Sequence, residues 1–411
     1  MPSREIAQSR DRQLAGAVYL HVPFCASKCK YCDFYSVPLD TDLAAAYVRA
    51  AQAELQWHSR FLQRPAQSVF FGGGTPTVLG PALMEPLLTA FAPFVGPRTE
   101  FTVEANPGTL DAEMAELLAS HGVNRASIGA QSFHAGELAV LGRMHTPADV
   151  ARAVAQARRE GIANVSLDLV YGIPGQTRLR WAESLRQALD LQVDHLSIYA
   201  LAFEPATPLW EDLRAGRTAE VAEDLQRAFY YDALEAASAA NLEHYELSNL
   251  ARPGMRCRHN LAYWHNAQYV GLGPGAASYI DGVRRKTRPD LSAYLQAAAT
   301  GCPPPADAER LTGPRAMAEA LMLGLRLVGG VNRRTFADRY GRDPVQAFAH
   351  SVGKHLRMGS IIVTPDVIKI ARDSLFVSDT VLADIIAEGQ LFSGRSPDVL
   401  NTPPHRTDKG T

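Results

Sequence analysis

Hydrophobic and polar positions along the chain alternate between two kinds of segment. Short apolar runs, each the length of one buried strand, are followed by longer stretches whose apolar residues recur at helical spacing. The predicted strands are Ala17–Val22, Ser68–Gly72, Glu100–Asn106, Arg125–Gln131, Asn164–Gly172 and His195–Leu201, with a weaker seventh at His244–Asn249. The predicted helices are Asp42–Phe61, Pro81–Phe91, Asp111–Ser120, Pro147–Glu160, Leu179–Leu189 and Glu220–Ala240.

Strands that alternate with helices predict βαβ units and a parallel sheet, so the expected fold class is α/β. Six such units suit either a doubly wound sheet or a barrel. In both folds, ligands bind at the carboxyl ends of the strands. Polar, cysteine and glycine residues follow or end several of the predicted strands, and we therefore expect the functional site at that edge of the sheet.

The pattern changes after about Ile280. Arg284–Asp290 is basic and typical of a loop, and the proline-rich run Gly301–Pro305 indicates a break. Helical spacing returns over Gly313–Gly329, and Ser360–Ile370 is rich in β-branched residues. We predict a short polar N-terminus (1–16), a partial-barrel domain (17–283), a linker (284–306), a small, mainly helical C-terminal domain (307–390) and a disordered tail (391–411).

Composition adds limits on location and partners. The chain has 411 residues, of which 46% are hydrophobic and 20% charged, as in ordinary globular proteins. A net charge of −2 gives no electrostatic reason to expect nucleic acid as a partner. No apolar run approaches the roughly 20 residues of a transmembrane segment, and the polar N-terminus lacks the apolar stretch of a signal peptide. We therefore expect a cytoplasmic protein.

Three of the five cysteines stand together in a C-x3-C-x2-C pattern directly after the first predicted strand, at Cys25, Cys29 and Cys32. Three thiolates can hold a 4Fe-4S cluster and leave one iron open to an outside ligand. The other two, Cys257 and Cys302, are distant, and a disulfide framework would show a more even set. The spacing leaves open a zinc site with His21 as its fourth ligand.

Glycines and acids follow the other strands. The run Gly72-Gly73-Gly74-Thr75-Pro76 allows close approach of backbone to a ligand, or it makes only a tight turn; it lacks the ending of a phosphate-binding P-loop. Glu104 and Asp168 are carboxylates in apolar strands, which favours a ligand site. They suit the amine and ribose hydroxyls of a nucleoside-type ligand. Arg143 either pairs with a carboxylate or is a solvated charge at a helix end.

A later run, His259-Asn-Leu-Ala-Tyr-Trp-His265, combines two histidines with two aromatic residues. An imidazole in an aromatic-lined pocket is a common arrangement for a heme ligand. Aromatic packing without a ligand explains the same spacing, and spacing alone favours that interpretation.

Taken together, these motifs resemble a radical S-adenosylmethionine (radical SAM) enzyme. More closely, the chain is similar to the oxygen-independent coproporphyrinogen III oxidase-like proteins and, within them, to the HemW heme chaperone branch. The resemblance spans roughly residues 17–388 and follows the family loosely from Ser360 onward. The runs that carry it are Tyr19–Cys25, Cys32–Phe34, Phe71–Pro76, Glu104–Pro107, Ile128–Phe133, Asp168–Pro174 and His259–Trp264.

The resemblance implies an incomplete (β/α)6 barrel with a lateral opening. It also implies that the three clustered cysteines hold a 4Fe-4S cluster whose fourth iron takes S-adenosyl-L-methionine. Positions that match the S-adenosylmethionine pocket of the family are Tyr19, Gly73, Gly74, Thr75, Glu104, Gln131, Arg143 and Asp168, with Tyr31 at a cofactor-contacting position.

Two departures separate the branches of this family. The oxidase has a further cysteine two places after the third, where this chain has Phe34, and it has a longer N-terminal extension. The H-N-x-x-Y-W run of the chaperones is intact. The resemblance thus implies heme binding, with His259 as the candidate contact and Cys257 and His265 as rivals. It further implies transfer of heme to an unidentified acceptor protein, with room for peripheral contact with a membrane acceptor. Coproporphyrinogen III oxidation, a radical step in porphyrin biosynthesis, is the alternative function.

Overall fold

The computed structural model describes residues 14–391. The chain forms two compact units: residues up to Tyr263 and from Ala267 to Arg310 belong to the first, and Trp264–Asn266 together with the chain from Leu311 onward belong to the second. The expectations for the N-terminal residues 1–13 and for the tail from 392 onward lie outside the described residues.

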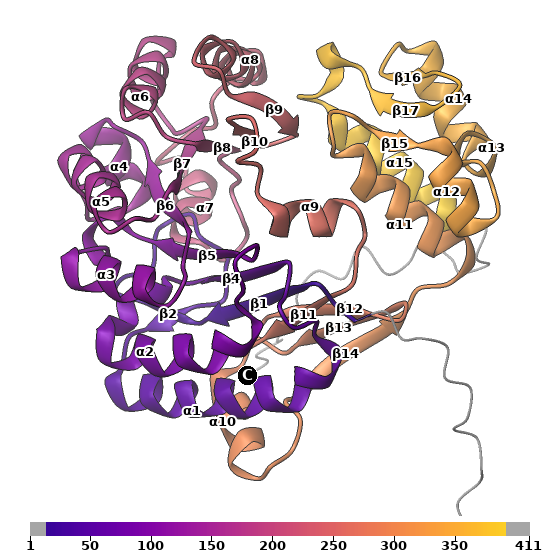
Figure 1. Ribbon diagram of the computed structural model, residues 1–411. Coiled ribbons are helices and arrows are strands. Elements are labelled where there is room, and N and C mark those ends of the chain that lie inside the picture. Colours follow the sequence, from indigo (N-terminus) through magenta and orange to yellow (C-terminus); the bar gives the residue numbers. More distant parts are fainter. Residues whose placement is uncertain (1–13, 392–411) are drawn as a thin grey trace, which may run out of the picture. The chain divides into compact units, whose positions relative to one another are not determined.

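A twelve-stranded sheet forms the framework of the first unit, in the order β14-β13-β12-β11-β1-β4-β5-β6-β7-β8-β10-β9. Its central strands pair in parallel, as predicted. Figure 1 shows these strands curving across the unit. They are β1 (Ala17–Val22), β4 (Ser68–Gly73), β5 (Glu100–Ala105), β6 (Arg125–Gln131), β7 (Asn164–Tyr171) and β8 (His195–Ala200).

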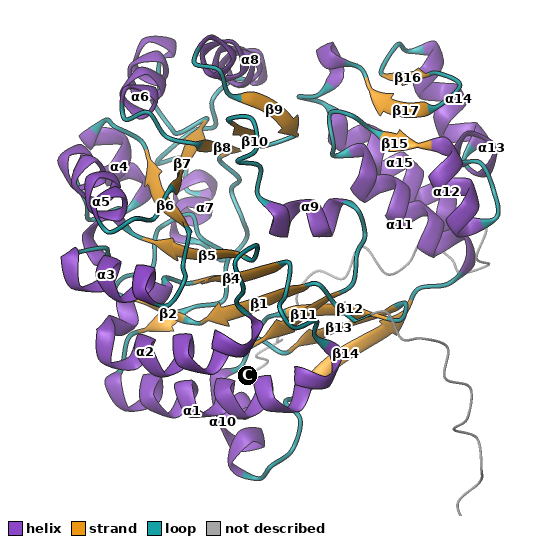
Figure 2. Cartoon of the chain, viewed as in Figure 1, coloured by secondary structure: helices purple, strands orange, loops and turns teal. Residues whose placement is uncertain are grey.

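Helices connect the parallel strands and pack along the outer face of the curved sheet (Figure 1). Side chains cap several of them: Asp40 accepts the N–H of Leu43, and Thr146 and Asp149 form a capping box. The helices are α1 (Thr41–His58), α2 (Gly80–Phe91), α3 (Ala112–Ser120), α4 (Ala135–Leu141), α5 (Pro147–Arg159), α6 (Arg178–Asp190), α7 (Pro208–Arg214) and α8 (Glu223–Ala239). Figure 2 shows the alternation of strand and helix that the sequence predicted.

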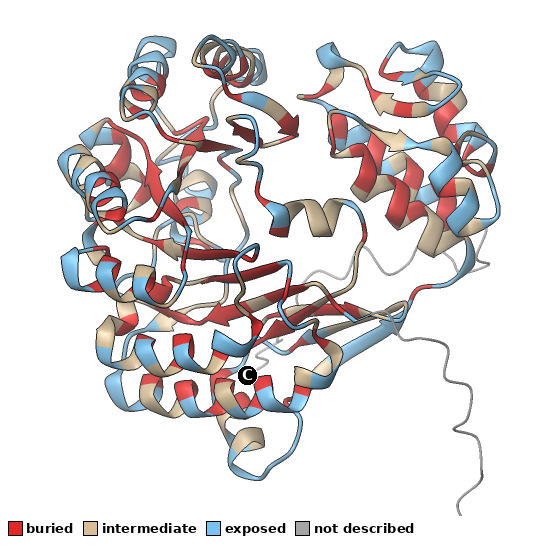
Figure 3. Cartoon of the chain, in the orientation of Figure 1, coloured by how far each residue is buried: buried red, intermediate tan, exposed pale blue. Residues whose placement is uncertain are grey.

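Strand β6 illustrates how the sequence divides between the two faces of the sheet. Ala126, Ile128 and Ala130 alternate with Ser127 and Gly129, and successive side chains of a strand point to opposite faces. The apolar set packs under the helices, and the strands are largely buried (Figure 3). Ser127 and Gly129, the other set, point to the opposite face of the sheet. Because the strands are parallel, their carboxyl ends lie together at one edge.

One helical segment is long and apolar enough, by length and composition, to cross a membrane: Pro76–Phe94, which contains α2. This is an exception to the expectation drawn from the apolar runs. Its side chains Leu87 and Phe91 are fully buried, and the ring centroid of Phe91 lies 4.8 Å from that of Phe71 on β4. In the first unit, the apolar residues of α2 thus pack against the sheet.

The predicted seventh strand, His244–Asn249, is wrong as a single element, although both of its ends are in strands. The region folds into two short strands, β9 (Glu243–Glu246) and β10 (Asn249–Ala251), which pair antiparallel with each other, and β10 also pairs antiparallel with β8. Leu247 and Ser248 form the turn between them, so the chain reverses direction where a single strand was expected.

The expected loop over Arg284–Asp290 is wrong for Arg284–Thr287, which form a strand, and confirmed for the three residues that follow. After β11 (Tyr269–Leu272), which pairs in parallel with β1, the sheet continues antiparallel through β12 (Ala277–Ile280), β13 (Val283–Thr287) and β14 (Ala306–Arg310). The basic side chains of β13 face carboxylates on its neighbour, as in the pair Arg284–Glu309 at 3.7 Å. This run of basic residues therefore forms a strand near the edge of the sheet and not a loop.

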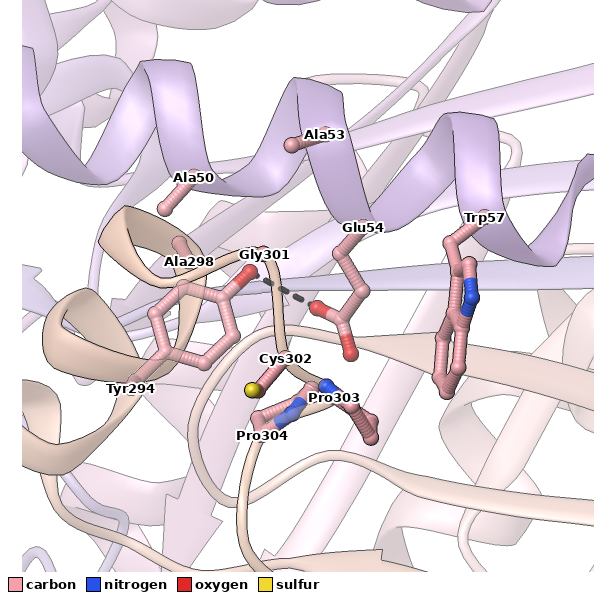
Figure 4. Close-up of a pocket in the computed structure, with 10 residues that line it drawn as sticks. All are labelled: Ala50, Ala53, Glu54, Trp57, Tyr294, Ala298, Gly301, Cys302, Pro303 and Pro304. Carbon is pink, nitrogen blue, oxygen red and sulfur yellow. Dashed lines mark hydrogen bonds between the residues drawn. The ribbon is translucent and has the colours of Figure 1, made fainter.

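The segment expected as a linker contains a further helix, α10 (Leu291–Ala299), which packs on α1. The hydroxyl of Tyr294 donates to Glu54 at 2.7 Å, and the same carboxylate oxygen accepts the N–H of Gly273 at 2.8 Å. Figure 4 shows this contact beside a small cavity of about 130 Å³, which the loop Gly301–Pro304 also lines. Residues 284–306 are thus an integral part of the first unit.

We expect Tyr294→Phe to lower the free energy of unfolding by about 1–2 kcal/mol, because a buried carboxylate loses one of its two donors. Burial already raises the pKa of Glu54, and Tyr294 is buried on the opposite helix. Urea unfolding monitored by circular dichroism measures the change. An unchanged midpoint would show that the contact does not stabilise the attachment of α10 to α1.

The second unit is mainly helical, as predicted, with the β-branched stretch forming a hairpin. Ile361 pairs with Ile370 across β16 and β17, and Phe348 and Ile385 are fully buried in its core. Its elements are α11 (Gly313–Leu325), β15 (Val331–Asn332), α12 (Arg333–Tyr340), α13 (Pro344–Ala347), α14 (Ala349–Arg357), β16 (Ile361–Val363), β17 (Val367–Ile370) and α15 (Ser378–Leu391).

Candidate cluster and cofactor site

The cysteine loop leaves the carboxyl end of β1 and is closed at its base by a short parallel ladder. Strand β2 (Phe24–Cys25) pairs with β3 (Val37–Pro38). Within the loop, the N–H of Cys32 donates to the carbonyl of Cys29 at 3.4 Å, and Lys30 is fixed to Leu141 by a backbone hydrogen bond of 3.0 Å. All three thiols are free and partly exposed, and the folded loop brings them to one cavity.

This cavity, of about 400 Å³, lies where the carboxyl ends of β4 to β8 meet the cysteine loop. Of the candidate site residues, all except Tyr19 and His259 line it. They are Cys25, Cys29, Tyr31, Cys32, Gly73, Gly74, Thr75, Glu104, Gln131, Arg143 and Asp168. Five separate strand ends thus converge as the parallel-sheet rule predicts, and a cavity of this size suits a nucleoside-sized ligand.

The glycine run after β4 is held against the cysteine loop by its backbone. Gly74 donates to the carbonyl of Val22 and Thr75 to that of Phe24, both at 2.8 Å. Gly73 has a φ of +111°, which only glycine adopts readily. The hydroxyl of Thr75 also lies 3.8 Å from the sulfur of Cys25. The run is therefore a fixed wall of the cavity beside the first cysteine.

A chain of hydrogen bonds continues this wall through Asn106, which ends the third predicted strand but was not among the predicted site residues. Its amide donates to the hydroxyl of Thr75 at 2.8 Å, and its carbonyl accepts from Arg143. Arg143 also donates to the carbonyl of Gly129 at 2.6 Å and to the sulfur of Cys29 at 3.4 Å. Position was the signal available for Asn106, since it is the last residue of a predicted strand and stands two places after Glu104.

The guanidinium of Arg143 supplies positive charge beside the thiols. Burial opposes that charge, but Tyr31 and Cys29 nearby raise the pKa of Arg143 above its usual value. Burial also raises the pKa of Cys32 to about 11, so iron that binds this sulfur must displace its proton. The buried cation thus faces the position where thiolate charge would develop.

Two carboxylates occupy the floor of the cavity. Glu104 accepts the N–H of Gly73 at 3.2 Å, and Asp168 accepts the hydroxyl of Ser127 at 3.2 Å. Burial, and then repulsion from Asp168, raise the pKa of Glu104 to about 8. Burial also raises the pKa of Asp168, which Arg125 partly offsets. A ligand that brings an ammonium group or hydroxyl donors would stabilise the charged form of these two carboxylates.

The raised pKa of Glu104 predicts a pH dependence of stability. Because the folded protein holds this proton up to about pH 8 and the unfolded chain releases it near pH 4.5, stability falls as the pH rises between those values. The cost is about 1.4 kcal/mol for each pKa unit. We expect Glu104→Gln to flatten this slope in urea titrations of the cofactor-free protein at pH 5, 6.5 and 8. Parallel slopes for the two proteins would contradict the assignment.

Gln131 ends β6 in an unusual backbone conformation. Its φ is +64°, and the pairing register of β6 with β7 shifts just before it. A non-glycine residue in this region costs free energy and is found mostly where function or packing requires it. Here the conformation places Gln131 in the lining of the cavity. Tyr31, on the cysteine loop, lines the same cavity, and burial raises the pKa of its hydroxyl.

The remaining two candidates lie away from the cavity. Tyr19 bonds to His21 at 3.1 Å and packs near the ring of His259. His259 is 1% exposed, with Nδ1 at 2.9 Å from the hydroxyl of Ser68 and Nε2 at 2.8 Å from that of Tyr263. It stands in α9 (Arg258–Trp264), whose first N–H groups donate to Glu100. Iron could bind this imidazole only after one of those hydroxyls had moved away.

The donor set fits an iron–sulfur cluster better than a single ion. Within residues 14–391, no three cysteine, histidine or acidic side chains converge closely enough for one metal ion. His21, the ligand suggested for a zinc site, bonds instead to the carbonyl of Tyr35 at 2.8 Å. The three thiols line one cavity of about 400 Å³, and cysteine thiolates are the usual ligands of a four-iron cluster.

Comparison with known proteins agrees with this geometry. Residues 19–188 match the family model of the radical SAM superfamily, and residues 311–369 match the HemN C-terminal domain. The coproporphyrinogen III oxidase HemN of Escherichia coli, described as a radical SAM enzyme, superposes with a TM-score of 0.80 over 93% of this chain and 92% of its own, at 18% identity. The α/β barrel prediction is thereby confirmed, and fold and site define a radical SAM protein.

Curated relatives narrow the class. The heme chaperone HemW of Bacillus subtilis is 36% identical over 79% of this chain and 87% of its own length. The heme chaperone HemW of Synechocystis is 40% identical over 77% of this chain and 79% of its own length. This chain belongs to the HemW family. Membership of the radical SAM superfamily implies a 4Fe-4S cluster and S-adenosylmethionine, and such a cluster supplies electrons and an iron position open to a ligand.

Proposed function

We propose that this chain is a heme chaperone, which binds heme and transfers it to an acceptor protein. The observation that carries the proposal is its identity of 34–40% with proteins named heme chaperone HemW, over 76–80% of this chain for those from four genera. The acceptor is a protein of unknown identity. Action in the cytoplasm and peripheral contact with a membrane acceptor stay predictions from the sequence.

We assign the cavity to the cluster and to S-adenosylmethionine. The proposed cluster ligands are Cys25, Cys29 and Cys32. In this assignment, the two carboxylates of the cavity bind the ammonium group and the ribose hydroxyls of S-adenosylmethionine, and Arg143 binds its carboxylate. Backbone and amide groups contact the other parts of the cofactor. The proposed cofactor contacts are Tyr31, Gly73, Gly74, Thr75, Glu104, Gln131, Arg143 and Asp168, all of which line the cavity. Tyr19 acts from behind it, through its contact with His21.

Phe34 favours the chaperone over the oxidase. Its side chain is 65% exposed and lines the cavity beside Cys32, at the position where the oxidase pattern has a further cysteine. Anaerobic incubation of the cluster-loaded protein with reductant, S-adenosylmethionine and coproporphyrinogen III tests the alternative. We expect no protoporphyrinogen, and its formation would favour the oxidase.

Titration with heme tests the proposed function. We expect a saturable Soret shift near one heme per chain. His259→Ala should weaken binding, whereas His121→Ala, at the end of α3, should leave it unchanged. The absence of a saturable shift in the unaltered protein would contradict the chaperone function. Of the rival contacts, Cys257 is fully buried and bonds to Glu100, whereas His265 is exposed, so a third variant, His265→Ala, completes the comparison.

A further inference from the structure

A turn in the second unit carries an unusual group of hydrogen-bond donors. Trp264, His265 and Asn266 connect α9 to the following chain, and Asn266 adopts a positive φ of 49° with 5% exposure. The turn packs closely on α11, because a side chain added at Gly324 would reach within 3.9 Å of the carbonyl oxygen of Trp264 and would collide with Val331. The turn is therefore fixed on the helices of its own unit.

Two arginines flank this turn. The guanidinium of Arg326, at the end of α11, lies 4.6 Å from the ring centroid of Trp264. Arg339, in the last turn of α12, donates to the carbonyl of Asn266 at 3.0 Å and to that of His265 at 3.4 Å. Both guanidinium groups thus lie within contact distance of three consecutive residues.

Two donors at this turn, one on Arg326 and one on Trp264, have no acceptor within residues 14–391. The Nε of Arg326 and the indole Nε1 of Trp264 are buried and have no hydrogen-bond partner among the described residues. Neither Arg326 nor Arg339 has a carboxylate within ion-pair distance in the part of the chain that the structure describes. Unpaired buried donors cost free energy, and an arginine that stacks on an indole presents its donors in a planar fork that matches a carboxylate.

We propose that the Trp264–Asn266 turn, with Arg326 and Arg339, recognises the carboxylates of heme. The proposal rests on the proposed function. Heme carries two propionate carboxylates beside a flat aromatic ring, and this turn offers two guanidinium groups and one indole. The exposed imidazole of His265 stands in the same turn. The motif that ends in Trp264 thereby gains a role for its final residue, which is to hold Arg326 in place.

Helix dipoles offer a structural alternative, because both arginines stand at helix carboxyl ends, where positive charge is favourable. A purely structural role predicts that removing either arginine lowers stability and leaves ligand selectivity unchanged. Carboxylate recognition predicts a change of selectivity. The two roles are therefore separated by comparing ligands that differ only in their carboxylates.

The experiment compares heme with heme dimethyl ester, in which both carboxylates are blocked, by Soret titration of the full-length protein. The unaltered protein should bind heme at least about tenfold more tightly than the ester, because the ester cannot form the two charge-assisted pairs with the arginines. Arg326→Gln and Arg339→Gln should each lower that ratio by threefold or more while leaving the affinity for the ester unchanged. Arg326→Lys keeps the charge but not the planar fork of donors. Its ratio of heme affinity to ester affinity should lie between those of the unaltered protein and Arg326→Gln.

Arg334→Gln is the matched control, because Arg334 is exposed on the same helix as Arg339. It should keep the full ratio. A ratio that survives both glutamine variants would overturn the proposal, as would equal binding of heme and ester by the unaltered protein, which would leave the chaperone function intact. Failure of the unaltered protein to bind either ligand would instead contradict the chaperone function itself. Unfolding midpoints of the variants verify that each is folded.

Discussion

Gly74→Ala is expected to destabilise the first unit by about 3–5 kcal/mol and to prevent assembly of the cluster site. A Cβ at this position would collide with the carbonyl oxygen of Phe24 and lie within 3.0 Å of two more atoms of its backbone. No rotamer change relieves such a contact, because backbone and not a flexible side chain is in the way. Denaturant unfolding monitored by circular dichroism measures the loss.

Gly108→Ala is the matched control for that variant. Gly108 follows the end of β5, and an added Cβ there would meet no atom within 4 Å. Alanine also reduces the freedom of the unfolded chain, so the control should be neutral or slightly stabilising. Equal stability of the two variants would show that the glycine run is not in tight contact with the cysteine loop.

Replacing Cys25, Cys29 and Cys32 together by serine should lower bound iron from about four atoms per chain to nearly none after anaerobic reconstitution, since serine oxygen is a poor substitute for thiolate. Iron and acid-labile sulfide assays measure the loss. Cys302→Ser is the control, because this thiol is exposed and lines the smaller cavity beside α10. Full iron content in the triple variant would place the cluster elsewhere in the chain.

The six central strands could be predicted because each is a buried apolar run that a helix follows, and local pattern determines both. The strands beyond β8 could not. β13 is a run of basic residues, and it is a strand only because β12 and β14 pair with it and carboxylates face it. Such pairing depends on residues that are distant in sequence, which the pattern within a short window does not contain.

The cavity at the carboxyl ends of the strands could be predicted from the sequence about as well as the strands themselves. Residues at strand ends were placed together by the parallel-sheet rule, and they do line one cavity. Tyr19 was placed by resemblance alone and His259 by its aromatic neighbours in sequence together with the resemblance, and the structure gives both of them partners inside the first unit. Asn106 was recognised as the end of a predicted strand but not as a site residue, because its side chain carries no charge, although it links Thr75 to Arg143.

The sheet of the first unit does not close, and an open sheet has two edge strands whose free N–H and C=O groups could pair with another chain. Here those edges are β9, with the sequence Glu-His-Tyr-Glu, and β14, with the sequence Ala-Asp-Ala-Glu-Arg. Both are short and charged, which is how natural proteins prevent edge-to-edge aggregation. The charges at these edges therefore disfavour pairing with a second chain, although the sheet is open.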